Sequence, residues 1–362
     1  MIDEELRRAL EESSRSIASA ETTEEVDEAF ARALAASLDA EQPGQPFVRD
    51  PRPGRLGFHN LGNSCYLAAV VQLLIHATPI LDIFHRDGIA MVNPNPVAQA
   101  FANIVNDVWT RFDENEGEPL YPRALLTALN QAVNGGAIRF VPDRTEDANE
   151  VLLLILDHLA MAFDGQLEPA VGMDIRITNR CQFCGSVVPR TDLAFQVNVG
   201  IPERATPAPV NDVDAEHVEE VVALYECLRT VVGVEEEIDG YACSSVCDGY
   251  TNSMQSTRVT ATTEIVIIAL KRFKNDGSKI QTEVEVPHVL DLPDLIPGGV
   301  FDLIGIGHHS GQTRAGGHYT SMFFHPVHGE WVEANDRAVV TMTNAPPVSS
   351  KTAYILVFQK RH

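Results

Sequence analysis

The spacing of apolar residues changes along this chain of 362 residues, and the change limits the folds it can adopt. Up to about residue 165 the apolar residues recur at helical spacing, most clearly in a long run at residues 150–163. Beyond that point, apolar runs at residues 264–273 and 354–359 are typical of buried strands. A stretch with several glycines at residues 308–317 is predicted to be a loop. We therefore expect a helix-rich part followed by a strand-rich part.

One cysteine follows a loop rich in glycine and asparagine. This loop begins at Gly57 and leads into an apolar stretch of helical spacing at residues 67–75, so Cys65 is expected at or just before a helix N-terminus. The positive end of the helix dipole favours the thiolate there, which is the nucleophilic form of cysteine. Asn60 and the loop N–H groups are well placed to donate hydrogen bonds to an oxyanion. The alternative is a buried structural cysteine after a turn.

A second segment, far along the chain, carries a candidate base. His318 follows two glycines and precedes a strand-like run, and residues 330–336 then form a short predicted strand that ends in Asn335 and Asp336. A cysteine, a distant histidine and a following Asn or Asp are the parts of a cysteine-protease triad. In this hypothesis Cys65 attacks a carbonyl, and His318 takes the thiol proton and returns it to the leaving amine. Asn335 fixes the orientation and tautomer of the imidazole.

These two segments resemble the Cys box and the His box of the ubiquitin-specific protease family of deubiquitinases. Three further stretches are similar to blocks of that family, in the family's order: residues 146–152, then 270–273 with 279–280 and 286–287, then 301–304 with 309–311. The resemblance extends from about residue 54 to residue 360. The sequence departs from the family at Ser64, where the family usually has Thr. It also departs at Glu146 and Val151, where the family usually has Gln and Phe.

The resemblance implies an α+β fold of the papain-like type, with a helical thumb, a β-rich palm and zinc-tipped fingers. We expect this catalytic domain at residues 55–361, with the fingers at about residues 175–260 and the active site between thumb and palm. The family hydrolyses the bond after the C-terminal Gly-Gly of ubiquitin. A protease for a ubiquitin-like modifier and a ubiquitin-binding adaptor without activity stay open as alternatives. By position, the resemblance implies these roles: Cys65 nucleophile, His318 base and acid, Asn335 third triad member, Asn60 oxyanion donor, and Asp336 a secondary support for His318.

Four other cysteines form two pairs. Cys181 and Cys184 make a CxxC knuckle, whereas Cys243 and Cys247 are spaced one residue wider than is usual in the family. Two such pairs suit a tetrahedral, structural zinc ion with no open position, and no cofactor is expected for catalysis. Free thiols or a disulfide in a relic finger are the alternatives. Cys227 lies in an apolar run and is interpreted as a packing residue.

The first 40 residues contain two stretches that are predicted to form amphipathic helices. In each, a large apolar residue is followed by Ala three and Ser seven positions later, which places the three on one helix face. The pattern resembles the ubiquitin-interacting motif. A solvated charged helix, or a helix docked on the core, is the alternative. Residues 41–54 are rich in Pro and Gly and are predicted to be a linker. The predicted ubiquitin-binding residues are Leu6, Ala9 and Ser13 in the first helix, and Phe30, Ala33 and Ser37 in the second.

Charge and composition limit the partners. The net charge of −24 argues against nucleic-acid binding and fits a basic partner, although it could equally serve solubility. No apolar run is long enough to span a membrane, and acidic residues stand where a secretory signal would be basic and then apolar. We therefore expect a cytoplasmic or nuclear protein whose partners are ubiquitin, polyubiquitin chains and ubiquitinated proteins, with no nucleic acid and no membrane.

Overall fold

The computed structural model describes residues 53–85, 91–110, 118–133, 145–202, 221–243, 247, 249–313 and 316–362. The chain divides into two compact units, and it passes between them more than once. Unit 1 comprises Met1–Asp164 and Gly307–Ala345, and unit 2 comprises Gly165–Ile306 and Pro346–His362. The predicted helices at residues 1–40 and nearly all of the predicted linker lie outside the described residues.

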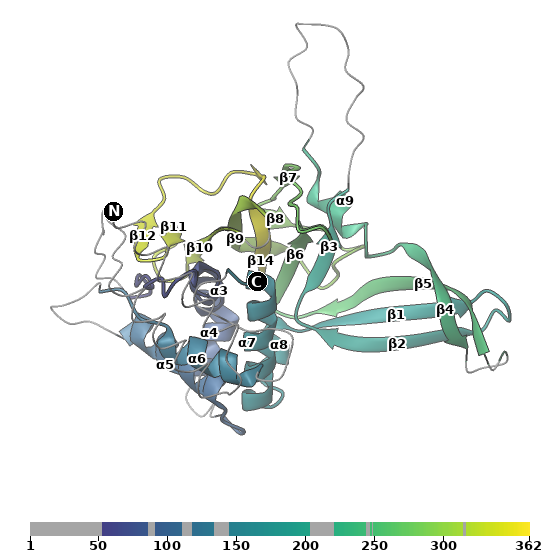
Figure 1. The fold of residues 1–362 in the computed structure, drawn as a ribbon, viewed down its shortest axis with the longest axis horizontal. Helices are drawn as coiled ribbons and strands as arrows, with labels where there is room; N and C mark the ends of the chain where they lie inside the picture. Colours follow the sequence, from purple (N-terminus) through teal and green to yellow (C-terminus); the bar gives the residue numbers. More distant parts are fainter. Residues whose placement is uncertain are drawn as a thin grey trace, which may run out of the picture. The chain divides into compact units, whose positions relative to one another are not determined.

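Unit 1 contains a group of helices (Figure 1), in which α3 (Cys65–Ile75) packs against α4 (Thr78–His85) and α7 (Ala148–Phe163). All eleven residues of α3 are buried, as expected for a helix that is apolar on every face. The start of α7 is set by Asp147, whose side chain accepts a hydrogen bond from the Asn149 N–H at 2.8 Å. The helix predicted at residues 150–163 is confirmed by α7. The helices are α3 (Cys65–Ile75), α4 (Thr78–His85), α5 (Pro96–Thr110), α6 (Arg123–Ala132) and α7 (Ala148–Phe163).

The strands of unit 1 form the sheet segment β12-β11-β10-β9. β10 (Gly316–His325) pairs antiparallel with β11 (Glu330–Asn335), which pairs with β12 (Ala338–Thr341). β10 also packs against α3. The prediction of a loop at residues 308–317 is wrong for most of this stretch, because β9 (Phe301–Thr313) continues to Thr313 and β10 begins at Gly316. The glycines in this stretch lie within paired strands, and the local sequence does not reveal that pairing.

Unit 2 contains the sheet segment β9-β14-β6-β3. The buried strands predicted at residues 264–273 and 354–359 are confirmed by β6 (Ile265–Lys271) and β14 (Ala353–Lys360), which pair antiparallel, while β3 (Val197–Gly200) joins β6 in parallel. Cys227 is buried in a short helix, and burial raises the pKa of its thiol to about 12, so the packing interpretation is confirmed. The remaining small elements are α8 (Glu168–Val171), α9 (Leu224–Leu228), β7 (Val284–Glu285), β8 (Val289–Leu290) and β13 (Ser349–Ser350).

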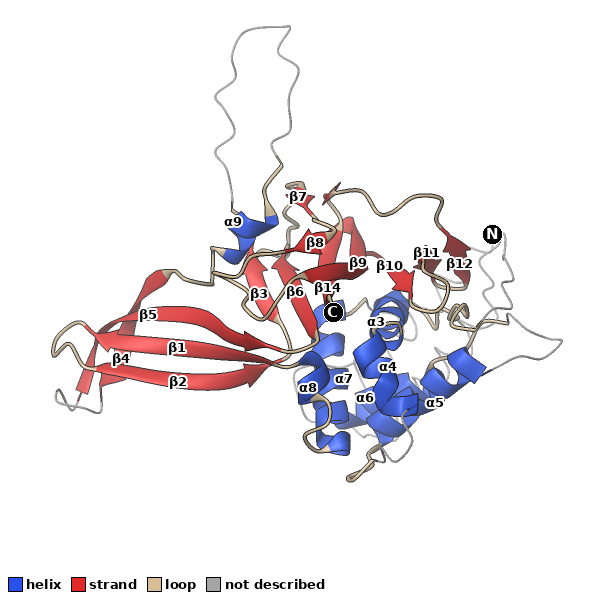
Figure 2. Ribbon diagram, turned by 180° about the vertical axis from the view of Figure 1, so that it is seen from behind, coloured by secondary structure: helices blue, strands red, loops and turns tan. Residues whose placement is uncertain are grey.

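A second sheet of unit 2 is made of four long strands in the order β2-β1-β5-β4, shown side by side in Figure 2. Every neighbouring pair is antiparallel. β1 ends at Cys181, opposite Ser253 of β5, and β4 ends at Cys243, opposite Gly249 of β5. The register therefore brings the two cysteine-bearing strand ends to one end of the sheet. The strands are β1 (Met173–Cys181), β2 (Val187–Ala194), β4 (Glu235–Cys243) and β5 (Gly249–Thr262).

The order of the elements confirms the α+β class. Among the described residues, all helices except the short α8 and α9 precede Gly165, and all named strands follow Gly172. Within the same part of the chain, no single helix has the length and apolarity to cross a membrane. α3 and α4 reach that length only together, and they are bent by 79° at the break between them.

Candidate active site and metal centre

The loop before α3 is folded on itself by hydrogen bonds around Ser64. The Ser64 hydroxyl accepts from the Leu61 N–H at 2.8 Å, and the Ser64 N–H donates to Asn60 Oδ1 at 2.9 Å. Cys65 is the first residue of α3, as the sequence predicted, and it is 2% exposed. The Ser64 hydroxyl, at the position where the resembling family usually has Thr, therefore helps to order the loop.

The protonation state of Cys65 differs from the expectation based on the helix dipole. Burial, helped by the negative charge of Asp336, raises the pKa of the Cys65 thiol to about 11. Backbone N–H groups, first that of Tyr319, act in the opposite direction and lower the pKa. Desolvation outweighs these N–H groups, so the resting group is a neutral thiol and needs a base before it can attack.

The predicted base, His318, lies on β10, and its predicted orienting partner, Asn335, lies on the neighbouring strand β11. Nε2 of His318 is 2.7 Å from Oδ1 of Asn335, and the antiparallel register that pairs Ser321 with Ala334 brings their two strands together. An amide oxygen only accepts, so Nε2 carries the proton and Nδ1 is left with a lone pair. Tyr319, next to His318, directs its backbone N–H to the Cys65 thiol. The structure therefore brings Cys65, His318 and Asn335 into one cluster.

Asp336 contacts Asn60 rather than the imidazole. Its Oδ2 accepts from Asn60 Nδ2 at 3.0 Å, and His318 acts on it only through charge. Burial raises the pKa of the Asp336 carboxyl, while His318, Asn60 and Arg337 lower it. With Oδ1 held by Ser64 and one N–H by Asp336, the Asn60 amide keeps one N–H for an oxyanion. Asp336 thus orients Asn60, and its role as a secondary support for His318 stays a prediction.

Gly57 makes a close contact to this cluster that the sequence reasoning missed. A Cβ at Gly57 would lie 2.4 Å from the carbonyl oxygen of Arg337 and 2.7 Å from that of Asp336. The next residue, Phe58, donates its N–H to the Asp336 carbonyl at 2.9 Å. The turn that carries Asn335 and Asp336 is therefore held directly against the beginning of the Cys65 loop. A glycine before an asparagine-rich loop was the only sequence signal for this contact.

The four predicted metal ligands converge at one end of the four-stranded sheet. Their Sγ atoms all lie within 4.8 Å of one another, and both the Cys181–Cys247 and the Cys184–Cys243 sulfur pairs are 3.7 Å apart. None of the described cysteines forms a disulfide. In a tetrahedral site with Zn–S bonds of about 2.3 Å, neighbouring sulfurs are separated by roughly 3.8 Å.

The polar surroundings of the thiols also fit a zinc ion. A hydrogen bond from Thr251 and backbone N–H groups lower the pKa of Cys181 to about 6, so this ligand is readily deprotonated. Burial and the neighbouring thiols raise the pKa of Cys247, which is the response expected when several thiols share one space without a cation. Four thiolates would fill the tetrahedron and leave no position for water, so the ion is structural. It would link the end of β1 to the β4–β5 turn.

The predicted ubiquitin-binding residues cannot be compared with the structure. Leu6, Ala9, Ser13, Phe30, Ala33 and Ser37 all lie outside the described residues.

Comparison with known families gives one match over most of the chain. Residues 56–358 match the family described as ubiquitin carboxyl-terminal hydrolase. Ubiquitin carboxyl-terminal hydrolase 2 of Rattus norvegicus is 24% identical over 356 residues, which cover 84% of this chain and 54% of the rat protein. Ubiquitin carboxyl-terminal hydrolase 22-A of Xenopus laevis is 24% identical over 359 residues, covering 85% of this chain and 66% of the frog protein. The chain thus spans between about half and two thirds of the length of these relatives.

Solved structures show the same fold. The SAGA Ubp8/Sgf11/Sus1/Sgf73 DUB module bound to ubiquitin aldehyde matches with a TM-score of 0.64 and 17% identity, covering 93% of this chain and 76% of that chain. The same module bound to monoubiquitin also has a TM-score of 0.64, at 18% identity. The papain-like fold that the sequence resemblance implied is therefore confirmed.

Proposed function

Because the chain belongs to the ubiquitin carboxyl-terminal hydrolase family, we propose that it is a thiol isopeptidase that cleaves the bond after the C-terminal Gly-Gly of ubiquitin. The observation that carries this proposal is the hydrogen bond of 2.7 Å between His318 and Asn335, beside the buried thiol of Cys65 at the start of α3. Both similar solved structures hold ubiquitin or its aldehyde. The chemistry of the cluster suits attack on a carbonyl.

The first step follows from the protonation states of the cluster. Cys65 starts as a thiol, and His318 has its lone pair on Nδ1 because Asn335 fixes the proton on Nε2. His318 takes the thiol proton as Sγ bonds to the carbonyl carbon, so charge develops on the carbonyl oxygen rather than on sulfur. Asn60 then donates its remaining N–H to that oxygen, in an orientation that Asp336 sets.

The later steps reuse the same groups. The tetrahedral intermediate collapses as His318 gives its proton to the leaving lysine amine, which leaves a thioester between Cys65 and the ubiquitin C-terminus. Water, deprotonated by His318, attacks the thioester and releases the free carboxylate and the thiol. No cofactor takes part in this sequence, and the zinc ion bound by the four clustered cysteines would act only on the fold.

The test uses ubiquitin with a fluorogenic C-terminal amide. It compares two variants, each of which replaces one buried cysteine with alanine. Cys65→Ala should abolish release of the fluorophore, while Cys227→Ala removes another buried thiol, in α9, and should keep most of the activity. Equal activity of Cys65→Ala and the wild type would refute the thiol mechanism. Ubiquitin binding without turnover by the wild type would favour the adaptor alternative, and turnover only of a ubiquitin-like amide would favour the modifier alternative.

We further propose that residues 1–40 bind ubiquitin within chains and that residues 41–54 tether them to the catalytic domain. Support comes from the sequence, where the spacing of a large apolar residue, Ala and Ser occurs twice. Two weak sites on one tether gain affinity for polyubiquitin through effective concentration. Deleting residues 1–50 should slow turnover of long chains more than release of the fluorogenic amide. Equal loss on both substrates would contradict this role.

The proposed location is the cytoplasm or the nucleus. The six cysteines are free within the described structure, which fits a reducing compartment. Fluorescence of a tagged chain in cells tests this assignment, and accumulation in a secretory compartment would contradict it.

A further inference from the structure

We call residues 53–58, which lead into the Cys65 loop, the strap, and polar side-chain contacts hold its residues 53–56. On the α3 side, Gln72 Nε2 donates to the Leu56 carbonyl at 2.8 Å. The His76 ring has carbonyl oxygens at both nitrogens, those of Gln72 and Gly54, each at 2.8 Å. The last turn of α3 is thereby joined to the strap.

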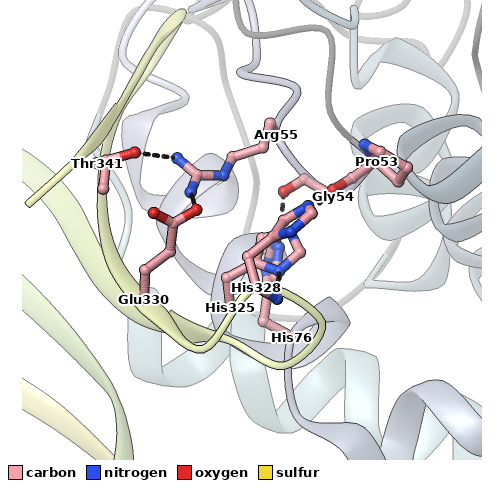
Figure 3. A network of polar contacts seen from close by, with 8 residues as sticks. All are labelled: Pro53, Gly54, Arg55, His76, His325, His328, Glu330 and Thr341. Atoms are coloured by element: carbon pink, nitrogen blue, oxygen red, sulfur yellow. Dashed lines mark hydrogen bonds and ion pairs between the residues drawn. The ribbon is translucent and has the colours of Figure 1, made fainter.

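The strands hold the strap from another side, as Figure 3 shows. His325, the last residue of β10, donates from Nε2 to the Pro53 carbonyl at 2.8 Å, while its Nδ1 accepts from the His328 N–H at 3.3 Å. Arg55 is fully buried, forms an ion pair with Glu330 of β11, and donates to the Thr341 hydroxyl of β12 at 2.9 Å. Three successive strands of the sheet therefore contact residues 53–55.

The strap fits in one position because three rings close around Gly54. The rings of His76, Trp109 and His325 are 5.4 to 5.6 Å apart in pairs. Gly54 has φ of +77°, and a Cβ there would lie 2.7 Å from His325 Nε2 and 2.9 Å from the Trp109 ring. Its N–H donates to the Val108 carbonyl at 2.9 Å. This close packing leaves the strap no room to slide.

The elements that hold the strap are those that carry the proposed reacting groups. Gln72 is seven residues beyond Cys65, on the same face of α3, and His76 is the C-cap residue of this helix. His325 ends the strand that contains His318. The far end of the strap binds the turn of Asp336 through the Phe58 N–H. The strap thus contacts the helix that carries Cys65, the strand that carries His318 and the turn that carries Asp336.

We infer that the strap sets the distance between Cys65 and His318, and that Gln72 and His325 are positioning residues for the thiol chemistry. This inference rests on the proposed function, because Gln72 and His325 touch no reacting atom and would act only by positioning Cys65 and His318. Strap and cluster are joined through backbone carbonyls, so loss of a side-chain donor loosens the strap without removing a catalytic group. A small shift between nucleophile and base costs rate rather than binding.

The variants are chosen to loosen the strap while keeping shape. Gln72→Met is isosteric, and it also removes a buried amide oxygen, Gln72 Oε1, that has no hydrogen-bond partner. His325→Phe keeps a ring but loses the donor to Pro53, while His325→Gln can restore a donor at the Nε2 position. His158→Phe, in α7 and away from the strap, is the matched control for the change from His to Phe. Thermal unfolding of each variant checks that it is folded.

Two readouts are used, and one of them does not depend on the substrate. With the fluorogenic ubiquitin amide, Gln72→Met and His325→Phe should lower kcat about tenfold with KM unchanged. Alkylation of Cys65 by iodoacetamide, followed on its peptide by mass spectrometry, is measured with and without His318→Ala. When His318→Ala is added to the wild-type sequence, alkylation of Cys65 should become slower. When it is added to a strap variant, the rate of alkylation should change little. His325→Gln should restore the wild-type kcat and the slowing of alkylation by His318→Ala.

The outcomes separate this inference from the proposed function. If folded strap variants keep the wild-type kcat and the full effect of His318→Ala on alkylation, the strap has no positioning role. If the variants lose thermal stability only, and His158→Phe behaves like them, the inference is also overturned. If the wild type does not turn over the ubiquitin amide, the proposed function fails, and the alkylation ratios alone decide on the strap.

Discussion

Replacing Gly57 with Ala should damage catalysis although Gly57 contacts no substrate. The new Cβ would lie 2.4 Å from the Arg337 carbonyl oxygen, whereas ordinary contact begins at 3.4 Å, so the turn must move by about 1 Å. That turn carries Asn335 and Asp336, which orient His318 and Asn60. A misplacement of about 1 Å can cost about a hundredfold in rate, or roughly 2.7 kcal/mol of activation free energy. Overpacking should also lower the free energy of unfolding by about 1 to 3 kcal/mol.

The assay compares kcat/KM of Gly57→Ala with that of Gly249→Ala, using the fluorogenic ubiquitin amide. At Gly249 the nearest atom to a new Cβ is the Cys247 carbonyl oxygen at 3.8 Å, so the same substitution causes no clash. Both variants are first shown to be folded by thermal unfolding. A folded Gly57→Ala protein with kcat/KM within about twofold of the wild type would refute the reasoning, because the turn would then tolerate the displacement.

Three further predictions concern the base, the metal and the response to acid. Asn335→Ala should lower kcat by about 5- to 100-fold in steady-state kinetics, because the His318 Nε2–H loses its acceptor, and Asn335→Asp should recover part of it; an unchanged kcat would contradict this. Cys243→Ser should abolish bound zinc in metal analysis and lower the melting temperature, while Cys227→Ser should retain the metal; equal zinc in both would exclude the four-cysteine site. Burial lowers the pKa of His76 from 6.5 to about 3 and that of His325 from 6.5 to about 4. Below pH 6.5, these two histidines therefore bind protons in the unfolded chain but stay neutral in the folded chain. Stability measured in urea should therefore fall from pH 6.5 toward pH 4, and it should fall less steeply in His76→Phe; identical slopes would show that His76 does not titrate as described.

The sequence predicted the features whose information is local. The apolar spacing predicted α7, β6 and β14, and the loop before the apolar run at residues 67–75 predicted Cys65 at the start of a helix. What it could not predict depends on partners far along the chain. The pKa of Cys65 is set by burial under the fold, and Gly57 matters only because the turn of Asp336 lies against it.

The same limit explains the other differences. The glycines at residues 308–317 predicted a loop because a glycine is compatible with both a turn and a strand, and only pairing between β9 and β10 decides. His325 has no motif of its own, since its acceptor is the carbonyl of Pro53 at the opposite end of the catalytic region. The pairing register of the strands brings Cys243 and Cys247 close to Cys181. The spacing of cysteines within each pair suggests a metal site but does not determine this register.

The buried, neutral thiol of Cys65 has a consequence for oxidative damage. Peroxide reacts with the thiolate and needs access to the sulfur, and Cys65 is 2% exposed with a pKa raised to about 11. Among the described cysteines, Cys181 has the lowered pKa, and zinc would shield it by occupying its sulfur. Loss of the metal would thus open the first route to oxidation at the end of the four-stranded sheet, while the Cys65 thiol stays reduced.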